Sequence, residues 1–409
     1  MVFKVVSLSP EDYRDLIPYF KLGRRFFDSS SSILVTSTVI EEIRKFYESG
    51  NVRRNSGVYP GTYESTRVIE ETRENLSKIL NVSNYKIAFP SNVSLGIFYA
   101  ISILYQKNRN SYLIYTNDLS NDILIPVRYF INKNACNAIQ LDIKDTPEKW
   151  LEILQTSFND IEIILILPLF SLSGESYQKN NFVNKLRKIF SIKLIIDAII
   201  SGGIFLSYLS KFEADLVIFD SNIGWGGPIG QGILMFKDYP VNVPLLLQGS
   251  GTVQSVTYKD IILLETNEKF ETAINPAVLH GLNASINLIQ PMISKMSDYI
   301  IHLNKTFRKK ISEINQILIL NNSINHENTP ITSFIIPEIN SHEVAVYLDE
   351  LSKIDIRSGY FCAHQLVDQL TKGYKTDGIL QVCFYYYNTI SDVDHFCHAI
   401  DNCVKLFSK

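Results

Sequence analysis

LIIDAIISGG, residues 194–203, and DLVIFDSNIGWGGPIGQGILMF, residues 215–236, each open with a run of apolar residues and continue into a loop of glycines and small polar residues. Continuous apolar runs of this length are typical of parallel strands that are buried on both faces. The second stretch also closes with such a run. The two stretches therefore predict three neighbouring strands, at Lys193–Ile196, Leu216–Phe219 and Gly232–Phe236.

The same pattern extends towards the N-terminus. Two further apolar runs, Tyr112–Tyr115 and Ile163–Leu167, predict strands, and amphipathic stretches such as Arg67–Leu80 and Trp150–Ser157 predict helices. Strands that alternate with helices favour βαβ units and a parallel sheet. We therefore expect a large α/β domain over this part of the chain.

The pattern changes from Pro276 onward. Leu279–Lys295 and Asp298–Asn315 predict two long helices, and Ser391 to about Leu406 predicts a final one. Between them we expect two short strands, Ile317–Leu320 and Thr332–Pro337, and a helix at Ser341–Leu351. The sequence therefore divides into a large domain, residues 24–285, and a small α/β domain built from residues 1–23 and 286–409.

Composition and charge exclude several classes of protein. The 409 residues are 46% hydrophobic and 20% charged, and the net charge is −3, which gives no basic footprint for nucleic acid. No stretch approaches the roughly 20 apolar residues that cross a bilayer, so we expect no membrane partner. The five cysteines are scattered, which favours reduced thiols in a cytoplasmic protein. Cys397 and Cys403 lie near two histidines, but the spacing fits no standard zinc pattern, and we expect no metal.

Seven segments follow one another in the order of a known family, at residues 26–47, 51–80, 194–203, 215–236, 270–276, 354–366 and 386–396. Together they resemble the class V aminotransferases and cysteine desulfurases, which are pyridoxal-phosphate (PLP) enzymes of fold-type I. The resemblance runs from about residue 20 to 405. It implies a three-layer αβα large domain with a mostly parallel seven-stranded sheet, plus a small α/β domain. It also implies a homodimer, with Phe270–Pro276 as the loop that crosses to the partner, or a heterodimer with a related subunit.

The chemistry of this family depends on two residues in the opening stretches. PLP needs a lysine amine to form an aldimine, and it needs a carboxylate beside its pyridine nitrogen. Asp197 matches the carboxylate; the alternative is an aspartate that caps the next helix. Phe219–Ile223 aligns without a gap onto the family's aromatic-Ser-Gly-His-Lys, so Asn222 replaces the histidine and Ile223 replaces the lysine.

Other positions depart from the family in the same direction. The phosphate loop contains Asn92 where a Gly-Thr-Thr sequence is expected, Ile274 replaces a threonine, and no histidine precedes His280 to stack on the pyridine ring. Gln381 replaces the arginine that clamps the substrate carboxylate, and a glutamine makes only weak neutral bonds. We therefore expect covalent PLP chemistry to be lost and no cofactor to be used, apart from loose non-covalent binding of PLP.

Cys362 matches the cysteine that attacks substrate sulfur in desulfurases, and Arg357 and His364 are close enough in sequence to activate its thiol. The alternative is an inherited loop cysteine. Arg53 and Arg54 either bind an anion in the cleft or lie on the surface. Trp225 either faces a ligand or fills the space of the lost cofactor. The residues expected to line the cleft are Ser30, Arg53, Arg54, Asn92, Asn222, Ile223, Trp225, Arg357 and Gln381, with Asp197 and Cys362 as the catalytic candidates.

Three functions are compatible with these residues. The first is an enzyme that has abandoned PLP and uses the old cleft for a small amino-acid-like or acyl substrate. The second is a non-catalytic partner or scaffold subunit. The third is a PLP-dependent desulfurase or lyase with unusual cofactor anchoring. The polar residues along the cleft favour the first, so we expect a small-molecule ligand and PLP-independent chemistry.

Overall fold

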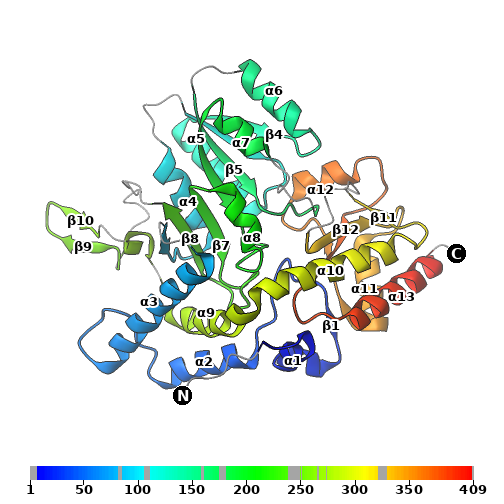
Figure 1. Ribbon diagram of the computed structural model, residues 1–409, viewed down its shortest axis with the longest axis horizontal. Helices are drawn as coiled ribbons and strands as arrows, with labels where there is room; N and C mark the ends of the chain where they lie inside the picture. Colours follow the sequence, from blue (N-terminus) through cyan, green and yellow to red (C-terminus); the bar gives the residue numbers. More distant parts are fainter. Residues whose placement is uncertain are drawn as a thin grey trace.

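A computed structural model describes residues 7–81, 85–105, 111–157, 161–174, 181–237, 249, 251–264, 267–272, 274–320 and 329–407 (Figure 1). A central sheet of seven strands holds the larger lobe together, in the order β2-β8-β7-β6-β5-β3-β4. Its strands are β2 (Tyr85–Ala88), β3 (Ser111–Thr116), β4 (Asn137–Leu141), β5 (Glu162–Pro168), β6 (Ser191–Asp197), β7 (Leu216–Asp220) and β8 (Gly232–Lys237). All five strands predicted for the large domain are present in it, and the predicted fold class is confirmed.

Five neighbouring strands of the sheet, from β7 to β4, run parallel, and β8 alone runs antiparallel to both of its neighbours. Since β2 is antiparallel to β8, it points the same way as the parallel strands. The carboxyl ends of six strands therefore meet at one edge, which is where open α/β sheets bind their ligands.

Both faces of the sheet are covered by helices, which explains the continuous apolar runs. Ile164 and Ile166 of β5 pack with α4 (Val93–Leu104) and α5 (Asn121–Asn134) on one face. Ile163 and Leu165 pack on the other face with residues of α3 (Pro60–Leu80), α6 (Pro147–Ser157), α7 (Asn181–Arg187) and α8 (Leu206–Leu209). Side chains that alternate along one strand thus fill two separate cores.

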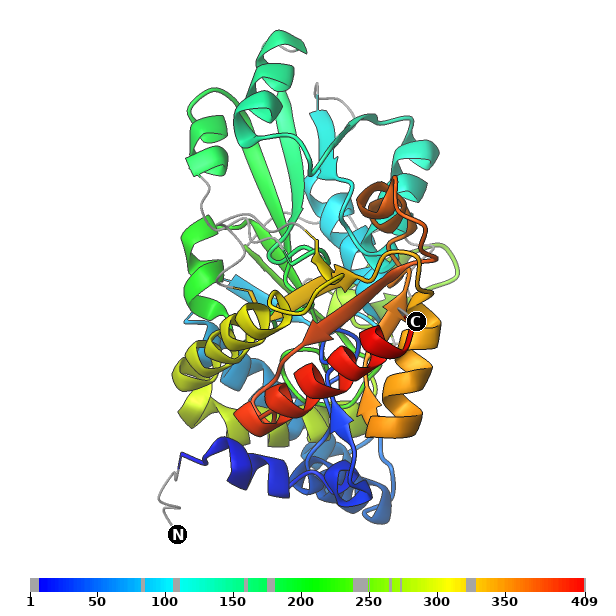
Figure 2. The same cartoon turned by 90° about the vertical axis from the view of Figure 1, so that its right-hand side faces the viewer.

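A second, four-stranded sheet forms the smaller lobe, in the order β11-β12-β15-β14. Its strands are β11 (Leu318–Ile319), β12 (Ile331–Ile335), β14 (Arg357–Gly359) and β15 (Ile379–Cys383), and its helices are α10 (Ile293–Ile311), α11 (Ser341–Ser352), α12 (His364–Thr371) and α13 (Ile390–Phe407). Figures 1 and 2 show α10 and α13 side by side against this sheet. The N-terminal strand β1 (Arg25–Phe26) pairs in parallel with β13 (Ile354–Asp355) of this lobe.

The break between the two long helices after Pro276 lies at another position than predicted. Helix α9 (Pro276–Ile289) ends earlier than expected, a 3-10 turn covers Gln290–Met292, and α10 begins at Ile293. Pro291 has no backbone N–H to donate and its ring hinders the preceding turn, so the break falls there and not near residue 296. Among the described residues, no helix has the length and apolar character needed to cross a membrane.

A buried ion cluster joins helix α3 to the loop that precedes α9. The Glu271 side chain is fully buried and contacts Arg54 at 2.7 Å and Arg73 at 2.9 Å. It also accepts a hydrogen bond from the backbone N–H of Phe89, which follows β2. One carboxylate therefore fixes three segments that are distant in sequence.

We predict that Glu271→Gln lowers the free energy of unfolding by about 3 kcal/mol, because Arg54 and Arg73 lose their fully buried partner and keep only the more exposed carboxylates of Glu268 and Glu70. Urea unfolding followed by circular dichroism measures the change. Glu41→Gln is the matched control, since Glu41 pairs with Arg44 on an exposed helix face and such pairs contribute about 1 kcal/mol or less. Equal stability losses in the two variants would contradict a structural role for the cluster.

Candidate functional site

The carboxyl edge of the central sheet brings Asp197 together with the loop after β7. Gly202 and Gly224 meet between these two loops, with φ values of +44° and +77°. A Cβ at Gly202 would lie 2.6 Å from the Cα of Gly224, so neither position accepts a side chain. The close contact fixes the turn after Asp197 against the segment that contains Ile223.

Asp197 is the last residue of β6 and its carboxyl group is buried. One carboxyl oxygen accepts a hydrogen bond from the backbone N–H of Ile199 at 3.0 Å, and α8 begins only at Leu206, so Asp197 does not cap that helix. The pKa of Asp197 is raised to about 7, mainly by burial; the Ile199 hydrogen bond opposes the rise, and the carboxylates of Asp118 and Asp122 add to it. In the part of the chain that is described, no side-chain cation lies within 4 Å of it. Such a carboxyl group suits a ligand that brings a positively charged N–H.

The loop after β7 is held by its own polar groups. One Asp220 carboxyl oxygen accepts hydrogen bonds from the backbone N–H groups of Asn222 and Ile223, at 2.7 and 3.1 Å. The Asn222 amide bonds to both the N–H and the C=O of Ile33 and to the C=O of Gly227. The Asn222 side chain therefore joins the N-terminal segment to this loop. Its oxygen and both of its N–H groups are bound within the protein. Ile223 is half-buried.

Trp225 packs into the core behind the loop. Its indole is fully buried, lies beside Phe219 with a centroid distance of 5.8 Å, and occupies the space that a side chain at Gly203 would need. Of the two alternatives for this residue, the structure places it as packing.

Helix α4 begins at the same edge, after β2. The Asn92 side chain accepts a hydrogen bond from the backbone N–H of Leu95 at 2.8 Å, so it caps the helix. The N-terminus of a helix carries partial positive charge and free N–H groups, which suits a phosphate.

Cys362 reaches this edge from the smaller lobe. Its loop follows β14, and Phe361 and Cys362 both have positive φ values, +51° and +55°. The C=O of Cys362 accepts a hydrogen bond from the backbone N–H of Asn121 at 2.7 Å, at the start of α5. The Cys362 side chain is exposed, and the ring of Tyr360 stacks on that of His364 at 4.9 Å. The thiol is therefore accessible and held next to the loop that follows β3.

Ser30, Arg357 and Gln381 form one hydrogen-bonded chain. A guanidinium N–H of Arg357 donates to the Ser30 hydroxyl at 3.2 Å, and that hydroxyl donates to the Gln381 side-chain oxygen at 2.6 Å. The nearby carboxyl of Asp28 is largely buried; burial raises its pKa, while Arg357 and the hydroxyls of Ser30 and Ser31 oppose the rise. Sequence reasoning missed Asp28, Asp118 and Asp220, although Asp220 directly follows the apolar run Leu216–Phe219.

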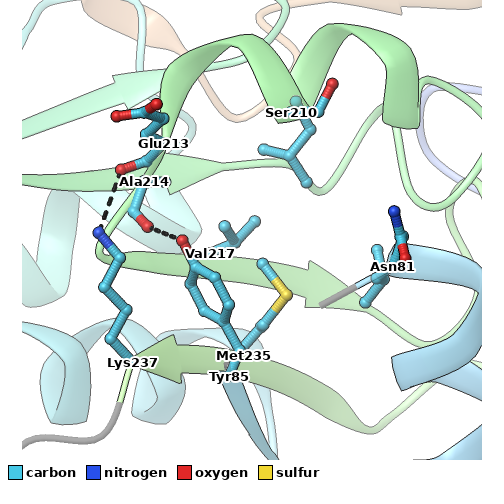
Figure 3. Close-up of a pocket in the computed structure, with 10 residues that line it drawn as sticks. Asn81, Tyr85, Ser210, Glu213, Ala214, Val217, Met235 and Lys237 are labelled. Atoms are coloured by element: carbon cyan, nitrogen blue, oxygen red, sulfur yellow. Dashed lines mark hydrogen bonds between the residues drawn. The ribbon is translucent and has the colours of Figure 1, made fainter. Parts of the chain in front are cut away.

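Arg53 and Arg54 line a hollow that does not include Asp197 or Cys362. This hollow of about 430 Å³ is also lined by Glu271, Ile274 and Pro276, and Arg54 is paired with Glu271. A larger hollow of about 560 Å³ lies at the opposite, amino edge of the sheet, between Tyr85, Val217 and Lys237 (Figure 3). Neither hollow includes Asp197 or Cys362. Among the described residues, no group of three or more His, Cys, Asp or Glu side chains is arranged to hold a metal ion.

We predict that Asp197→Asn changes how the stability of the protein without ligand depends on pH. The folded pKa of about 7 exceeds the unfolded value of 3.8, so the folded state binds more protons between these values. Wild-type stability therefore falls as pH rises through that window, by up to about 4 kcal/mol from this group. The variant lacks this loss, so it gains stability relative to wild type between pH 5 and pH 8.

Urea unfolding at the two pH values measures the difference. Asp298→Asn, at an exposed position of α10, is the matched control and keeps the wild-type dependence. A parallel pH dependence in wild type and Asp197→Asn would show that the Asp197 carboxyl is ionised in the folded protein throughout.

Comparison with known proteins gives matches along nearly the whole chain. A "Probable cysteine desulfurase" of Pyrococcus abyssi is 25% identical over 401 residues, covering 97% of this chain and 98% of that protein. The apo structure of a cysteine desulfurase from Thermococcus onnurineus has a TM-score of 0.83 at 21% identity, covering 98% and 99% of the two chains. A mutant of the protein C-DES, solved with glycine covalently linked to the PLP cofactor, has a TM-score of 0.76 at 15% identity, covering 95% and 99%.

These matches overturn two expectations from the sequence. The expected function, an enzyme that has lost covalent PLP chemistry, and the expected absence of a cofactor are both wrong, because the relatives are named cysteine desulfurases and a solved relative contains PLP. The physical reason lies in how the replaced residues are used. Asn222, Trp225 and Gln381 serve packing and backbone hydrogen bonds, so their identities say little about the ligand. Asp197, which faces no protein cation, is the informative residue.

The sequence profile of the aminotransferase class-V family matches residues 25–396, which is most of the chain. The predicted family and fold are thus confirmed, and this chain belongs to the aminotransferase class-V family of fold-type I PLP enzymes.

Proposed function

We propose that this protein is a PLP-dependent cysteine desulfurase-type enzyme, which takes sulfur from a small sulfur-containing amino acid such as L-cysteine. The observation that carries the proposal is the buried Asp197 carboxyl group at the carboxyl edge of the sheet, which no described protein cation neutralises. The full-length similarity to cysteine desulfurases supports it.

The residues at the carboxyl edge suit the two ends of PLP. Asp197 would hold a proton on the pyridine nitrogen, and an ionic hydrogen bond to that N–H would offset the burial of the carboxylate. The N-terminus of α4, behind the Asn92 cap, would hold the phosphate. When bound, PLP supplies an electron sink for bonds at the α-carbon of an amino acid.

Residue 223 stands at the position of the family's lysine. The gapless alignment places Ile223 there, and an isoleucine has no amine to join to PLP. We therefore propose that Asp197 and the N-terminus of α4 hold PLP here, and that residue 223 supplies no amine to it. The backbone of the loop is otherwise well ordered by the Asp220 carboxyl and by the Gly202–Gly224 contact, so the segment remains a wall of the site.

Cys362 would receive the sulfur. Its thiolate would attack the substrate sulfur, an S–S bond would form, and the C–S bond of the substrate would break with its electron pair left on carbon. The exposed thiol on a loop fixed to α5 suits this task, since it can meet a substrate and later pass the sulfur on.

The oligomeric state and the cellular compartment are also proposed here. We propose a homodimer whose crossing loop is Phe270–Pro276, of which residue 273 lies outside the described residues; the hollow lined by Arg54 and Ile274 next to this loop supports such a contact. We further propose that the protein works in the cytoplasm, where its five cysteines would stay reduced.

We predict that the purified protein binds added PLP, and that borohydride reduction leaves no PLP on residue 223, which offers no amine. Equilibrium dialysis measures the binding and mass spectrometry detects an adduct. Asp197→Asn weakens PLP binding at least about tenfold, because an ionic hydrogen bond is lost, while Asp298→Asn does not. Failure of wild type to bind millimolar PLP would refute the proposed function, and equal PLP affinity in wild type and Asp197→Asn would refute the role of Asp197.

We predict that Cys362→Ser abolishes sulfide release from L-cysteine in the presence of PLP and a thiol reductant, with a drop of at least about a hundredfold. A serine hydroxyl cannot accept the sulfur, and the substitution leaves the loop's backbone contacts in place. Cys397→Ser on α13 is the matched control and keeps wild-type turnover. Undiminished sulfide release by Cys362→Ser, with a PLP affinity equal to that of wild type, would show that sulfur does not pass through Cys362.

A further inference from the structure

The side chain at position 381 cannot bind a substrate carboxylate. Gln381 lies on β15 and is fully buried. Its amide nitrogen donates to the C=O of Leu172 at 2.6 Å and to the Ser333 hydroxyl at 3.2 Å, and its oxygen accepts from Ser30. Both amide hydrogens are therefore used inside the protein, and none is left for a ligand.

A guanidinium group stands directly across the strand pair from that position. In the antiparallel pairing of β14 with β15, Arg357 is the register partner of Gln381. Directly opposed residues share one face of a sheet, with Cβ atoms about 5 Å apart. The Ser30 hydroxyl bridges the two side chains, so they also meet beyond the backbone.

The Arg357 guanidinium is held in place without a direct ion pair, and the largely buried Asp28 carboxyl interacts with it electrostatically from beyond the Ser30 hydroxyl. One N–H donates to Ser30 and another to the C=O of Phe361 at 3.2 Å, and the guanidinium carbon lies 5.0 Å from the centre of the Phe361 ring. Within the described ranges no carboxylate lies within 4 Å of it, and the side chain is half-buried. Arginine has five N–H donors, so a fixed fork with unused donors remains for a carboxylate.

Arg357 is also close to the Cys362 thiol along the chain. It donates to the C=O of Phe361, the residue that precedes Cys362. A carboxylate bound to Arg357 would therefore lie beside the loop that presents the thiol, as a sulfur-containing amino acid requires.

We propose that Arg357 binds the α-carboxylate of the substrate, and that this task has moved across the β14–β15 pair from position 381 to position 357. The inference rests on the proposed function and adds the residue that selects amino acids over amines. It makes Arg357 a substrate-binding residue and Gln381 a structural one.

The test compares L-cysteine with cysteamine, which has the same amine and thiol but no carboxylate. Isothermal titration calorimetry of the PLP-loaded protein gives both affinities, and dialysis of the same preparation gives its PLP content. We expect wild type to prefer L-cysteine at least about tenfold. Arg357→Gln loses roughly tenfold to a hundredfold of L-cysteine affinity and little cysteamine affinity, because only the carboxylate contact disappears. Arg357→Lys keeps part of the preference.

Arg44→Gln, on the exposed face of α2 (Ser37–Glu48), is the matched control and keeps the full preference. An Arg357→Gln variant that binds PLP and still prefers L-cysteine overturns the inference and leaves the proposed function intact. A wild type that binds no PLP refutes the proposed function, and equal affinity for the two ligands in PLP-loaded wild type also overturns the inference.

Discussion

The parallel pairing of β6 between β5 and β7 is the constraint on which the site depends. Asp197 is in register with Pro168 on one side and Ile218 on the other. A carboxyl group at the end of a strand covered on both faces is shielded from water, and this burial accounts for most of the rise in its pKa. The same pairing brings the loops after β5, β6 and β7 to one edge. Without β6 in the middle of the sheet, the loops after β5 and β7 would not meet beside Asp197, and its pKa would not be raised by burial.

The polar residues at this edge are of two kinds. Some have all their hydrogen-bonding atoms bound within the protein, and others can still bind a ligand. The Asn222 and Gln381 side chains have their donors bound to backbone or side-chain acceptors, so they contribute order. Asp197, Arg357 and Cys362 keep polar atoms that can still bind or react with a ligand. Counting polar residues in a cleft overestimates its ability to bind a ligand, since a saturated amide offers a ligand nothing.

Sequence reasoning succeeded where one physical rule dominates. The apolar runs of β3, β5, β6, β7 and β8 are long and uninterrupted, so burial on both faces decided their structure and the fold followed. The break at Pro291 was missed because the apolar helix pattern continues through it. The use of Asn222, Trp225 and Gln381 was not predictable, because it depends on which backbone groups approach from distant segments such as Ile33 and Leu172. The expected loss of the cofactor rested on Ile223 above all, with substitutions such as Asn222 and Gln381 beside it, and the named desulfurase relatives contradict it.

Besides binding a carboxylate, Arg357 would stabilise the backbone of the loop at Phe361 and Cys362. The effect of substituting it therefore has two components. Phe361 and Cys362 adopt left-handed backbone conformations, which cost about 1–2 kcal/mol per residue for side chains with a Cβ. Two hydrogen bonds oppose this cost, one from Arg357 to the C=O of Phe361 and one from Asn121 to the C=O of Cys362. Loss of the guanidinium therefore also loosens the loop. A loosened loop would weaken the binding of any ligand with an amine and a thiol, whereas a lost carboxylate contact weakens only the amino acid. The ratio of the two affinities, and not either affinity alone, thus distinguishes recognition of the substrate from support of the loop.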